Sequence, residues 1–325
     1  MENGVLVISL DFELLWGVFD KVDYKEKETY FLNTKKLIPE LLELFTEYNI
    51  HCTWATVGML FNKNWEEWNT NFPQVLPGYS DQKLSAFSYG EKNQSAETEI
   101  LIFAPEIISL ISKTPGQEIG THTYSHYYCL EEGQTINSFK ADLKKAIELA
   151  KKQGIILRSL VFPRNQFNDD YLKVCYELGI ENVRSNPSNW YWANTQKDSL
   201  VDKIFRTGDA YMGFNNKFYS QGELQRENGK PLPQKASRLL RPYSPNKFLN
   251  DFKLKRIKSE MTDAAKNKEI YHLWWHPHNF GDFPVENLAD LKSILNHFNY
   301  CNEKYGFQSY NMYEIGNFVR LNLSV

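Results

Sequence analysis

The segment Val5-Leu6-Val7-Ile8-Ser9-Leu10-Asp11-Phe12-Glu13 decides the fold. Its first residues are apolar without alternation, which is typical of a parallel strand that is buried on both faces. Along the rest of the chain, short apolar runs alternate with helical patterns, as in repeated βαβ units. Strands are expected at 52–57, 119–121, 157–162, 180–183 and 270–275, and helices at 105–112, 138–152, 169–178 and 287–305. The sequence therefore predicts one α/β domain over residues 1–325, built on a mainly parallel sheet.

Two segments interrupt this alternation, at about 61–99 and 187–250. Both are rich in aromatic, Asn, Gly and Pro residues, and neither has the pattern of a domain with its own core. Long loops in a compact α/β domain usually serve as lids or binding walls. We expect both insertions to form walls above the carboxyl ends of the strands, where their aromatic rings could stack on sugars; the alternative is that these rings are ordinary core and loop material. The aromatic residues concerned are Trp65, Trp68, Tyr79, Trp190, Tyr191 and Trp192.

The composition argues against several classes of protein. The 325 residues carry a formal charge of −3, whereas a nucleic-acid-binding surface needs a clustered excess of Lys and Arg. No apolar run approaches the roughly 18 residues that span a bilayer, and Asp11 and Glu13 interrupt any signal peptide. The four cysteines are isolated, which is typical of reduced thiols. We therefore expect a cytoplasmic protein without a membrane span or a nucleic-acid partner, and its oligomeric state is left open.

Asp11 and Glu13 come directly after the first strand. Residues two apart in an extended chain point to the same side, so the two carboxylates are expected to converge. The carboxyl ends of parallel strands are also where such folds keep their active sites. The alternative is a pair of solvated acids at a strand end.

His122 and His126 follow the strand expected at 119–121. On a helical turn, two histidines four apart project from one face and can chelate one metal ion. Together with a carboxylate from Asp11 or Glu13, they would form a common catalytic zinc set. The alternative is a chance pair of imidazoles. Cys129 also has a suitable spacing, but a buried free thiol explains it better.

Two more strand ends carry candidate residues. After 270–275, His276 could protonate a leaving amine, and His278 follows it two residues on. His272, within the same strand, is better explained as a hydrogen-bonded histidine among aromatic rings. After 157–162, Arg164 could hold a neighbouring carboxylate ionised, although Arg158 is a competing choice and a rim salt bridge is the simpler alternative.

At these positions the chain resembles the polysaccharide deacetylases, the NodB-homology group of carbohydrate esterase family four. Residues 8–13 resemble the first motif of that family, and Gly120-Thr-His122-Thr-Tyr-Ser-His126 resembles its metal-binding H-[ST]-x-x-H motif. Phe162-Pro-Arg164-Asn165 is similar to its third motif, and Leu273-Trp-Trp-His276 to its last. The resemblance covers residues 5 to about 318 outside the two insertions. It implies a distorted (β/α)7-type barrel.

The resemblance also implies a reaction, the metal-dependent removal of an acetyl group from an amino sugar or another saccharide. The substrate would be a precursor of a cell-surface glycan or polysaccharide. One divalent cation, zinc first and otherwise cobalt, nickel, iron or manganese, would be held by Glu13, His122 and His126. Asp11 would be the base, Arg164 its partner and His276 the acid, and the substrate would contact Trp190, Trp275 and His278.

The chain departs from the family pattern in three places. The adjacent Asp pair of the first motif is here Asp11-Phe12-Glu13, so Glu13 must do the work of the second acid. Pro163 precedes Arg164, whereas the family places the arginine first, and the counterpart of D-x-x-D-W at 186–190 has no carboxylate. The alternatives are a cyclic-amide hydrolase of the same fold and a non-catalytic saccharide-binding protein.

Overall fold

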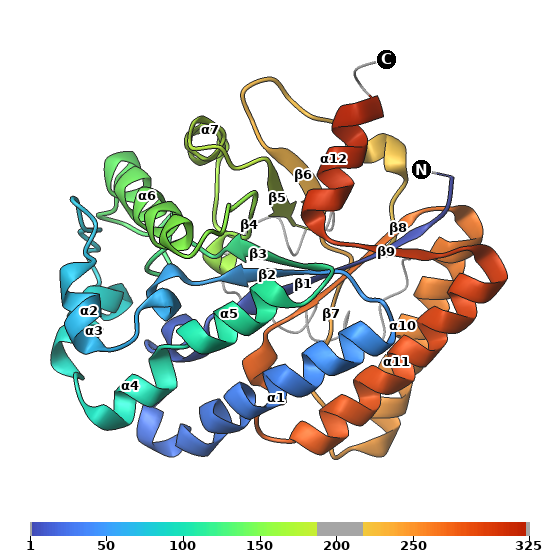
Figure 1. Cartoon of the computed structure of the whole chain (residues 1–325), viewed down its shortest axis with the longest axis horizontal. Helices are drawn as coiled ribbons and strands as arrows, with labels where there is room; N and C mark the ends of the chain where they lie inside the picture. The colour runs from blue at the N-terminus through green and yellow to red at the C-terminus, as the bar shows by residue number, and fades with distance from the viewer. Residues whose placement is uncertain (1, 187–216, 323–325) are drawn as a thin grey trace.

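A parallel sheet forms the centre of the computed structural model, which describes residues 2–186 and 217–322. β1 (Val5–Phe12) lies between β2 (Cys52–Thr56) and β8 (Ile270–Trp275), and the row continues as β6-β5-β4-β3-β2-β1-β8-β7 (Figure 1). The other strands are β3 (Gln117–Thr121), β4 (Ser159–Leu160), β5 (Asn182–Ser185), β6 (Leu232–Lys235), β7 (Arg238–Leu239) and β9 (Gln308–Tyr310), which pairs with the start of β1. Within the described residues β6 and β7 do not pair, so the sheet forms an open barrel. The predicted parallel α/β barrel is confirmed.

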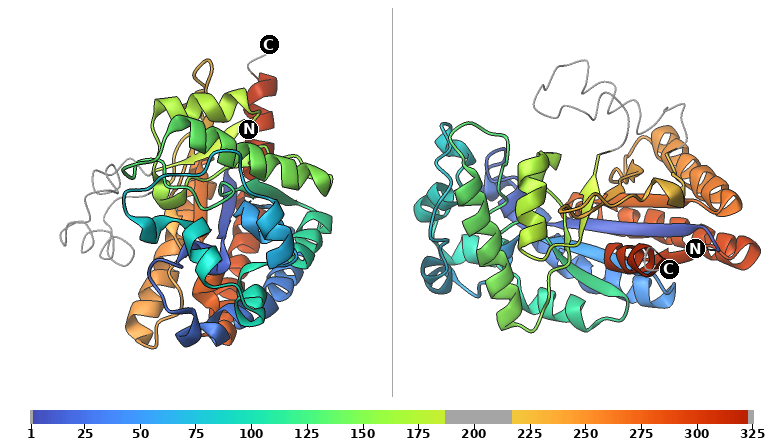
Figure 2. Two further views of the ribbon diagram at one scale, coloured as in Figure 1. Left: turned by 90° about the vertical axis from the view of Figure 1, so that its left-hand side faces the viewer. Right: turned by 90° about the horizontal axis from the view of Figure 1, so that it is seen from above.

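The interior of the barrel changes character along β1. Every residue of this strand is buried, and the strand runs through the middle of the molecule with helices on both sides (Figure 2). Val5 and Val7 pack in an apolar cluster with Leu232 and Ile270. Because side chains alternate along a strand, the polar residues further along β1 continue on that interior side. The carboxyl end of the barrel is therefore polar and the amino end is apolar.

Long helices cover the sheet. α1 (Glu28–Glu47), α5 (Pro105–Lys113), α10 (Lys247–Asn267) and α11 (Pro284–Tyr305) lie on one side, and α6 (Ile136–Lys152), α7 (Asp169–Glu177) and α12 (Met312–Asn322) lie elsewhere around it (Figure 1). The helices predicted near 105–112, 138–152, 169–178 and 287–305 are confirmed to within three residues. The strand expected at 157–162 is only two residues long, because the chain turns at Pro163. Among the described residues, every helix is too short or too polar to cross a membrane.

The first predicted insertion folds into three short helices, α2 (Trp65–Thr70), α3 (Ala86–Lys92) and α4 (Ala96–Ile102). They lie at the end of the barrel towards which β1 runs (Figure 1). Trp65 and Trp68 are buried, and each packs against Trp16 with ring centroids 6.2 Å apart. Tyr79 is buried as well. The expectation that these rings stack on sugars is wrong, because they fill the core between this layer and the barrel.

The second predicted insertion is shorter than 187–250, because its last part belongs to the barrel. Both β6 and β7 fall within it, as does the start of α10. Arg238 of β7 forms a buried, two-pronged ion pair with Glu260 of α10, at 2.6 Å for each bond. Trp190, Tyr191 and Trp192 lie outside the described residues, so the aromatic wall expected there stays a prediction.

Candidate active site

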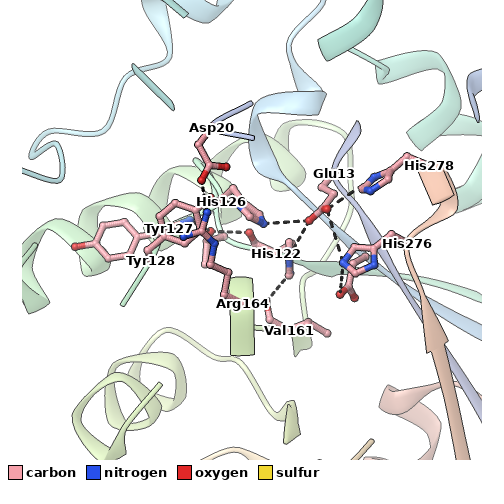
Figure 3. Close-up of polar contacts among 12 residues, drawn as sticks. Glu13, Asp20, His122, His126, Tyr127, Tyr128, Val161, Arg164, His276 and His278 are labelled. Atoms are coloured by element: carbon pink, nitrogen blue, oxygen red, sulfur yellow. Dashed lines mark hydrogen bonds and ion pairs between the residues drawn. The ribbon is translucent and has the colours of Figure 1, made fainter. Parts of the chain in front are cut away.

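A cavity of about 640 Å³ opens at the carboxyl ends of the strands. It collects acids and histidines from three strand ends that are distant in the sequence (Figure 3). These are Asp11 and Glu13 at the end of β1, His122 and His126 after β3, and His276 and His278 after β8. The structure thus brings these six side chains together around one cavity.

Three of these side chains could hold a metal ion. Glu13, His122 and His126 are buried, and each offers a ligand atom within 4.8 Å of the other two. The Oε2 atom of Glu13 lies 3.3 Å from Nε2 of His122 and 3.0 Å from Nε2 of His126. An oxygen and two imidazole nitrogens form a donor set that suits zinc and leaves room for water or substrate.

The outer ring nitrogens of both histidines support this assignment. Nδ1 of His122 lies 2.8 Å from the carbonyl oxygen of Val161, which can only accept, so Nδ1 carries the proton. Nδ1 of His126 lies 3.1 Å from the hydroxyl of Tyr128. Burial lowers the pKa of His126 to about 4 despite the nearby Glu13, so this imidazole is neutral near pH 7. At His122 a nitrogen lone pair thus faces the carboxylate oxygen of Glu13, an arrangement that a cation stabilises, and the residues fit the metal.

The two histidines lie in an irregular loop after β3, not on the helical turn that their spacing predicted. Thr123 and His126 have φ angles of 65° and 55°, in the left-handed region that few non-glycine residues adopt. These two reversals let both imidazoles reach Glu13 from one short loop. Such a conformation persists only where the surroundings determine it, and it often marks a functional site.

Asp142 of α6 holds this loop in place. Its carboxylate accepts hydrogen bonds from the backbone N–H groups of Tyr124 and Ser125, at 2.7 and 3.1 Å, and from the hydroxyl of Ser125. Burial outweighs these bonds and raises the pKa of Asp142 to about 7. Sequence reasoning missed this residue. The available signal was an acid three residues after Phe139, on the face of α6 that is otherwise apolar.

The turn after β1 explains how Glu13 reaches the same point from two positions beyond Asp11. Leu14 has a φ of 47° and opens the short helix η1 (Leu14–Gly17). The Glu13 carboxylate folds back over Gly17, where a Cβ atom would stand 1.9 Å from the carboxyl carbon. Glycine is therefore required at position 17 for this placement of the acid.

Asp11 is paired with Arg184 of β5, not with Arg164. The guanidinium of Arg184 donates to both carboxylate oxygens, at 2.6 and 2.7 Å, and to the hydroxyl of Ser9 at 3.1 Å. Burial by itself would raise the pKa of Asp11, but the charge of Arg184, with that of His276, lowers the pKa below its ordinary value. Asp11 is consequently held ionised, as a general base requires.

The expected role of Arg164 as the partner of Asp11 is wrong. Arg164 has a φ of 53°, which turns its side chain to the ring of Tyr128, 4.1 Å from the guanidinium carbon, and to an ion pair with Asp20. The residue that does hold Asp11 was missed, although Arg184 lies one position beyond the strand expected at 180–183. Its position at the end of an expected strand was the feature of the sequence that could have identified it as a partner of Asp11.

On β8, the tryptophan that faces the cavity is Trp274. Trp275, which we expected to contact the substrate, is fully buried and stacks on Phe280 with centroids 5.8 Å apart. That expectation is wrong, because alternation along the strand turns Trp275 outward to the helices. Trp274 lines the cavity, and the guanidinium carbon of Arg184 lies 4.2 Å from the centre of its ring.

The two histidines that follow β8, His276 and His278, differ in how far they are buried. Nε2 of His276 lies 3.5 Å from Asp11 and 3.7 Å from Glu13, and its side chain is 26% exposed. His278 is buried between Glu13 and the rings of Tyr30 and Phe31, at centroid distances of 5.8 and 6.3 Å. Burial lowers its pKa to about 4. The contact of His278 with a substrate stays a prediction.

His272 is confirmed as a structural histidine. It is fully buried within β8, and its Nε2 atom lies 2.8 Å from the hydroxyl of Ser9. Burial lowers its pKa to about 3, so it stays neutral. Ser9 joins this histidine to Arg184 and thereby extends the support of Asp11 across the barrel.

Replacing Arg184 with Met should lower the free energy of unfolding by about 3–5 kcal/mol, because it leaves the buried Asp11 carboxylate without its partner. Chemical denaturation would measure the loss. In the double variant Asp11→Asn/Arg184→Met no buried charge is left unpaired, so we expect at least half of the stability to return. Losses that simply add in the double variant would contradict this pairing.

The fold is shared with proteins of known structure. A protein from Mycobacterium smegmatis described as a polysaccharide deacetylase is 14% identical, with a TM-score of 0.59 over 98% of this chain and 92% of that one. A corresponding protein from Pseudomonas aeruginosa PAO1 is 12% identical, with a TM-score of 0.56 over 96% and 89%. The Puue allantoinase is 10% identical, with a TM-score of 0.57 over the same shares. Likeness at such low identity shows the fold alone.

The sequence carries the family assignment. No curated protein matches the chain. The family model for polysaccharide deacetylase, however, matches residues 17–183, which is just over half of the 325 residues and includes both histidines after β3. The chain therefore belongs to the polysaccharide deacetylase family.

Proposed function

We propose that this protein is a metal-dependent hydrolase that removes an acetyl group from an amino sugar or another saccharide. One observation carries the proposal: the buried donors Glu13, His122 and His126 open into the same cavity as Asp11 and His276. Membership of the polysaccharide deacetylase family supports the class of substrate. Zinc is the first choice of metal, and cobalt, nickel, iron or manganese suits the same donors.

Each side chain has a distinct part in the reaction. A cation held by Glu13, His122 and His126 would supply Lewis-acid polarisation of the acyl carbonyl and a more acidic water. Asp11, kept ionised by Arg184, accepts the proton of the attacking water. His276, at the open side of the cavity, donates a proton to the departing amine or alcohol.

The remaining wall of the cavity suits a small acyl group. Phe162, Leu239 and Trp274 line it beside the acids and histidines. These apolar side chains can cover a methyl group while leaving the carbonyl exposed to the polar side. An acetyl group fits this division better than a charged or long acyl chain does.

Replacing His276 with Ala should lower kcat by about 10²–10⁴-fold, the usual effect of losing one acid–base group. His278→Ala is the matched control, because it removes a neighbouring imidazole that faces Glu13 from the buried side. We expect the smaller loss of kcat from this control. The assignment would be reversed if His278→Ala caused the larger loss while His276→Ala stayed near wild type.

Acetate release by the purified protein tests the function as a whole. We expect release from N-acetylglucosamine oligomers or O-acetylated oligosaccharides, its loss on removal of metal by a chelator, and its return on addition of zinc. Turnover of the cyclic amide allantoin without acetate release would favour the alternative hydrolase. Bound metal without any turnover would favour a saccharide-binding protein. We propose a cytoplasmic precursor of a cell-surface glycan as the natural substrate, and cell fractionation would test the location.

A further inference from the structure

The turn that follows β4 has an unusual backbone beside the candidate metal site. Arg164 and Asn165 have φ angles of 53° and 52°, so two consecutive non-glycine residues are left-handed. Each such residue costs about 1–3 kcal/mol, a strain that proteins retain chiefly where function needs it. Both residues line the same cavity as the acids and histidines. The mechanism above gives neither of them a part.

The guanidinium of Arg164 is held rigidly at the wall of this cavity. Its guanidinium carbon lies 4.1 Å from the ring centre of Tyr128, and an ion pair joins it to Asp20 (Figure 3). Glu131 lies 3.9 Å from Nη1. The side chain nevertheless remains 24% exposed. A planar donor group that is fixed before binding loses little conformational entropy when it meets a ligand.

Asn165 offers complementary groups next to it. Its backbone N–H donates to the carbonyl of Phe162 at 2.9 Å, which fixes the turn. In the part of the chain that the structure describes, its side-chain amide has no hydrogen-bond partner, and the residue is half-buried in the cavity wall. The amide carries both donors and an acceptor, as the recognition of a hydroxyl group requires.

The positive charge of Arg164 is offset by its neighbours. It stands between two carboxylates, Asp20 and Glu131, although Lys21 and Arg241 also line the cavity. Beside Arg164 a phosphate or carboxylate would meet these two carboxylates, whereas a neutral hydroxyl can accept from Arg164 and exchange hydrogen bonds with Asn165. Amides and paired guanidinium groups thus match an uncharged, hydroxyl-bearing ligand.

We propose that Arg164 and Asn165 form a subsite that binds hydroxyl groups of an uncharged sugar of the substrate. The inference rests on the proposed saccharide deacetylation and adds to it where the sugar is held and which charge it has. Arg164 is thereby a binding residue of the cavity wall, not a partner of the base. Asp20 acts through Arg164 as a positioning residue.

Ligand binding can be separated from catalysis in the Asp11→Asn protein loaded with zinc. The probe is the β-1,4-linked trimer of N-acetylglucosamine, with binding measured by calorimetry. Asn165→Gly removes the amide but keeps the left-handed backbone, and Arg164→Lys removes the planar donor but keeps the charge. One or two lost hydrogen bonds should weaken binding of the trimer about 5–30-fold in each variant.

Asn49→Gly is the matched control, because Asn49 is also left-handed, with a φ of 50°, but lies between α1 and β2 at the other end of the barrel. We expect it to bind the trimer as the parent does. Zinc content and thermal unfolding are compared in all variants, and Asn165→Asp serves if Asn165→Gly fails to fold. UDP-N-acetylglucosamine tests the charge, and we expect it to bind more weakly than the trimer.

The outcomes are distinct. Unchanged affinity for the trimer in Arg164→Lys and in the Asn165 variant would overturn the subsite and leave the proposed function intact. Tighter binding of the nucleotide sugar, lost in Arg164→Lys, would overturn the uncharged class of ligand. If the parent bound neither the trimer nor an O-acetylated xylo-oligosaccharide, the saccharide substrate itself would be wrong, and the subsite with it.

Discussion

Replacing Asp11 with Asn is expected to lower kcat by about 10²–10⁴-fold while the protein keeps its metal. The amide preserves the shape of the side chain and can still hydrogen-bond to Arg184, which contacts both carboxylate oxygens in the structure. It cannot accept a proton from water. The metal donors are other side chains, so the donor set is unaffected.

The metal content and kcat of the Asp11→Asn protein decide this prediction together. Metal content near that of the wild type, with most turnover lost, would assign the base to Asp11. A protein that emerged without metal would instead make Asp11 a ligand. Activity close to the wild type would show that another group accepts the proton, and Asp11 would then be a structural partner of Arg184.

Replacing Glu13 with Gln should remove metal and activity together. The amide has no negative charge to offset that of the cation, and Glu13 is the only acid of the three-residue donor set found in the described part of the chain. Changes to groups that merely support a ligand weaken metal binding about 10–100-fold, so loss of the ligand charge should exceed about 100-fold. Titration of the metal-free protein with zinc measures this loss.

Glu118→Gln is the matched control for Glu13→Gln. Glu118 is also an acid of the barrel, but it is half-buried in β3 at the amino end, where it accepts a hydrogen bond from Thr53 at 2.6 Å. We expect this control to retain zinc affinity and turnover. If Glu13→Gln bound zinc as the wild type does, the donor set would be misassigned, and equal losses in both variants would indicate general damage to the fold.

The sequence predicts most of the fold because strands that are buried on both faces leave a strong apolar signal. β1 and β8 are such strands, and the predicted bounds of β8 are those of the structure. β6 escaped notice because its sequence, Leu232-Pro-Gln-Lys, is short and half polar. Its membership of the sheet depends on pairing with β5, a contact that local pattern does not reveal.

The donor set could be predicted for a related reason. Residues that follow buried parallel strands must meet at one edge of the sheet, so Glu13, His122 and His126 were within reach of sequence reasoning. The partner of Asp11 was not, because Arg164 and Arg184 both lie near the ends of strands that reach this edge. The left-handed turn at Arg164 directs that side chain away from Asp11, and nothing in the local sequence indicates this turn.

The pairing of Asp11 with Arg184 bears on how relatives of this protein should be compared. In the family pattern the arginine belongs to the motif near position 162, whereas here a guanidinium from the next strand along the chain, β5, supports the acid. What matters is where the guanidinium lies in the barrel, and an arginine on any strand that ends near the acid can support it. During evolution an arginine can therefore disappear from one motif without loss of chemistry, provided that a neighbouring strand has already supplied another. Alignments that score such a chain as defective at the motif would overlook this support of the acid, whereas superposition of the strand ends would find it.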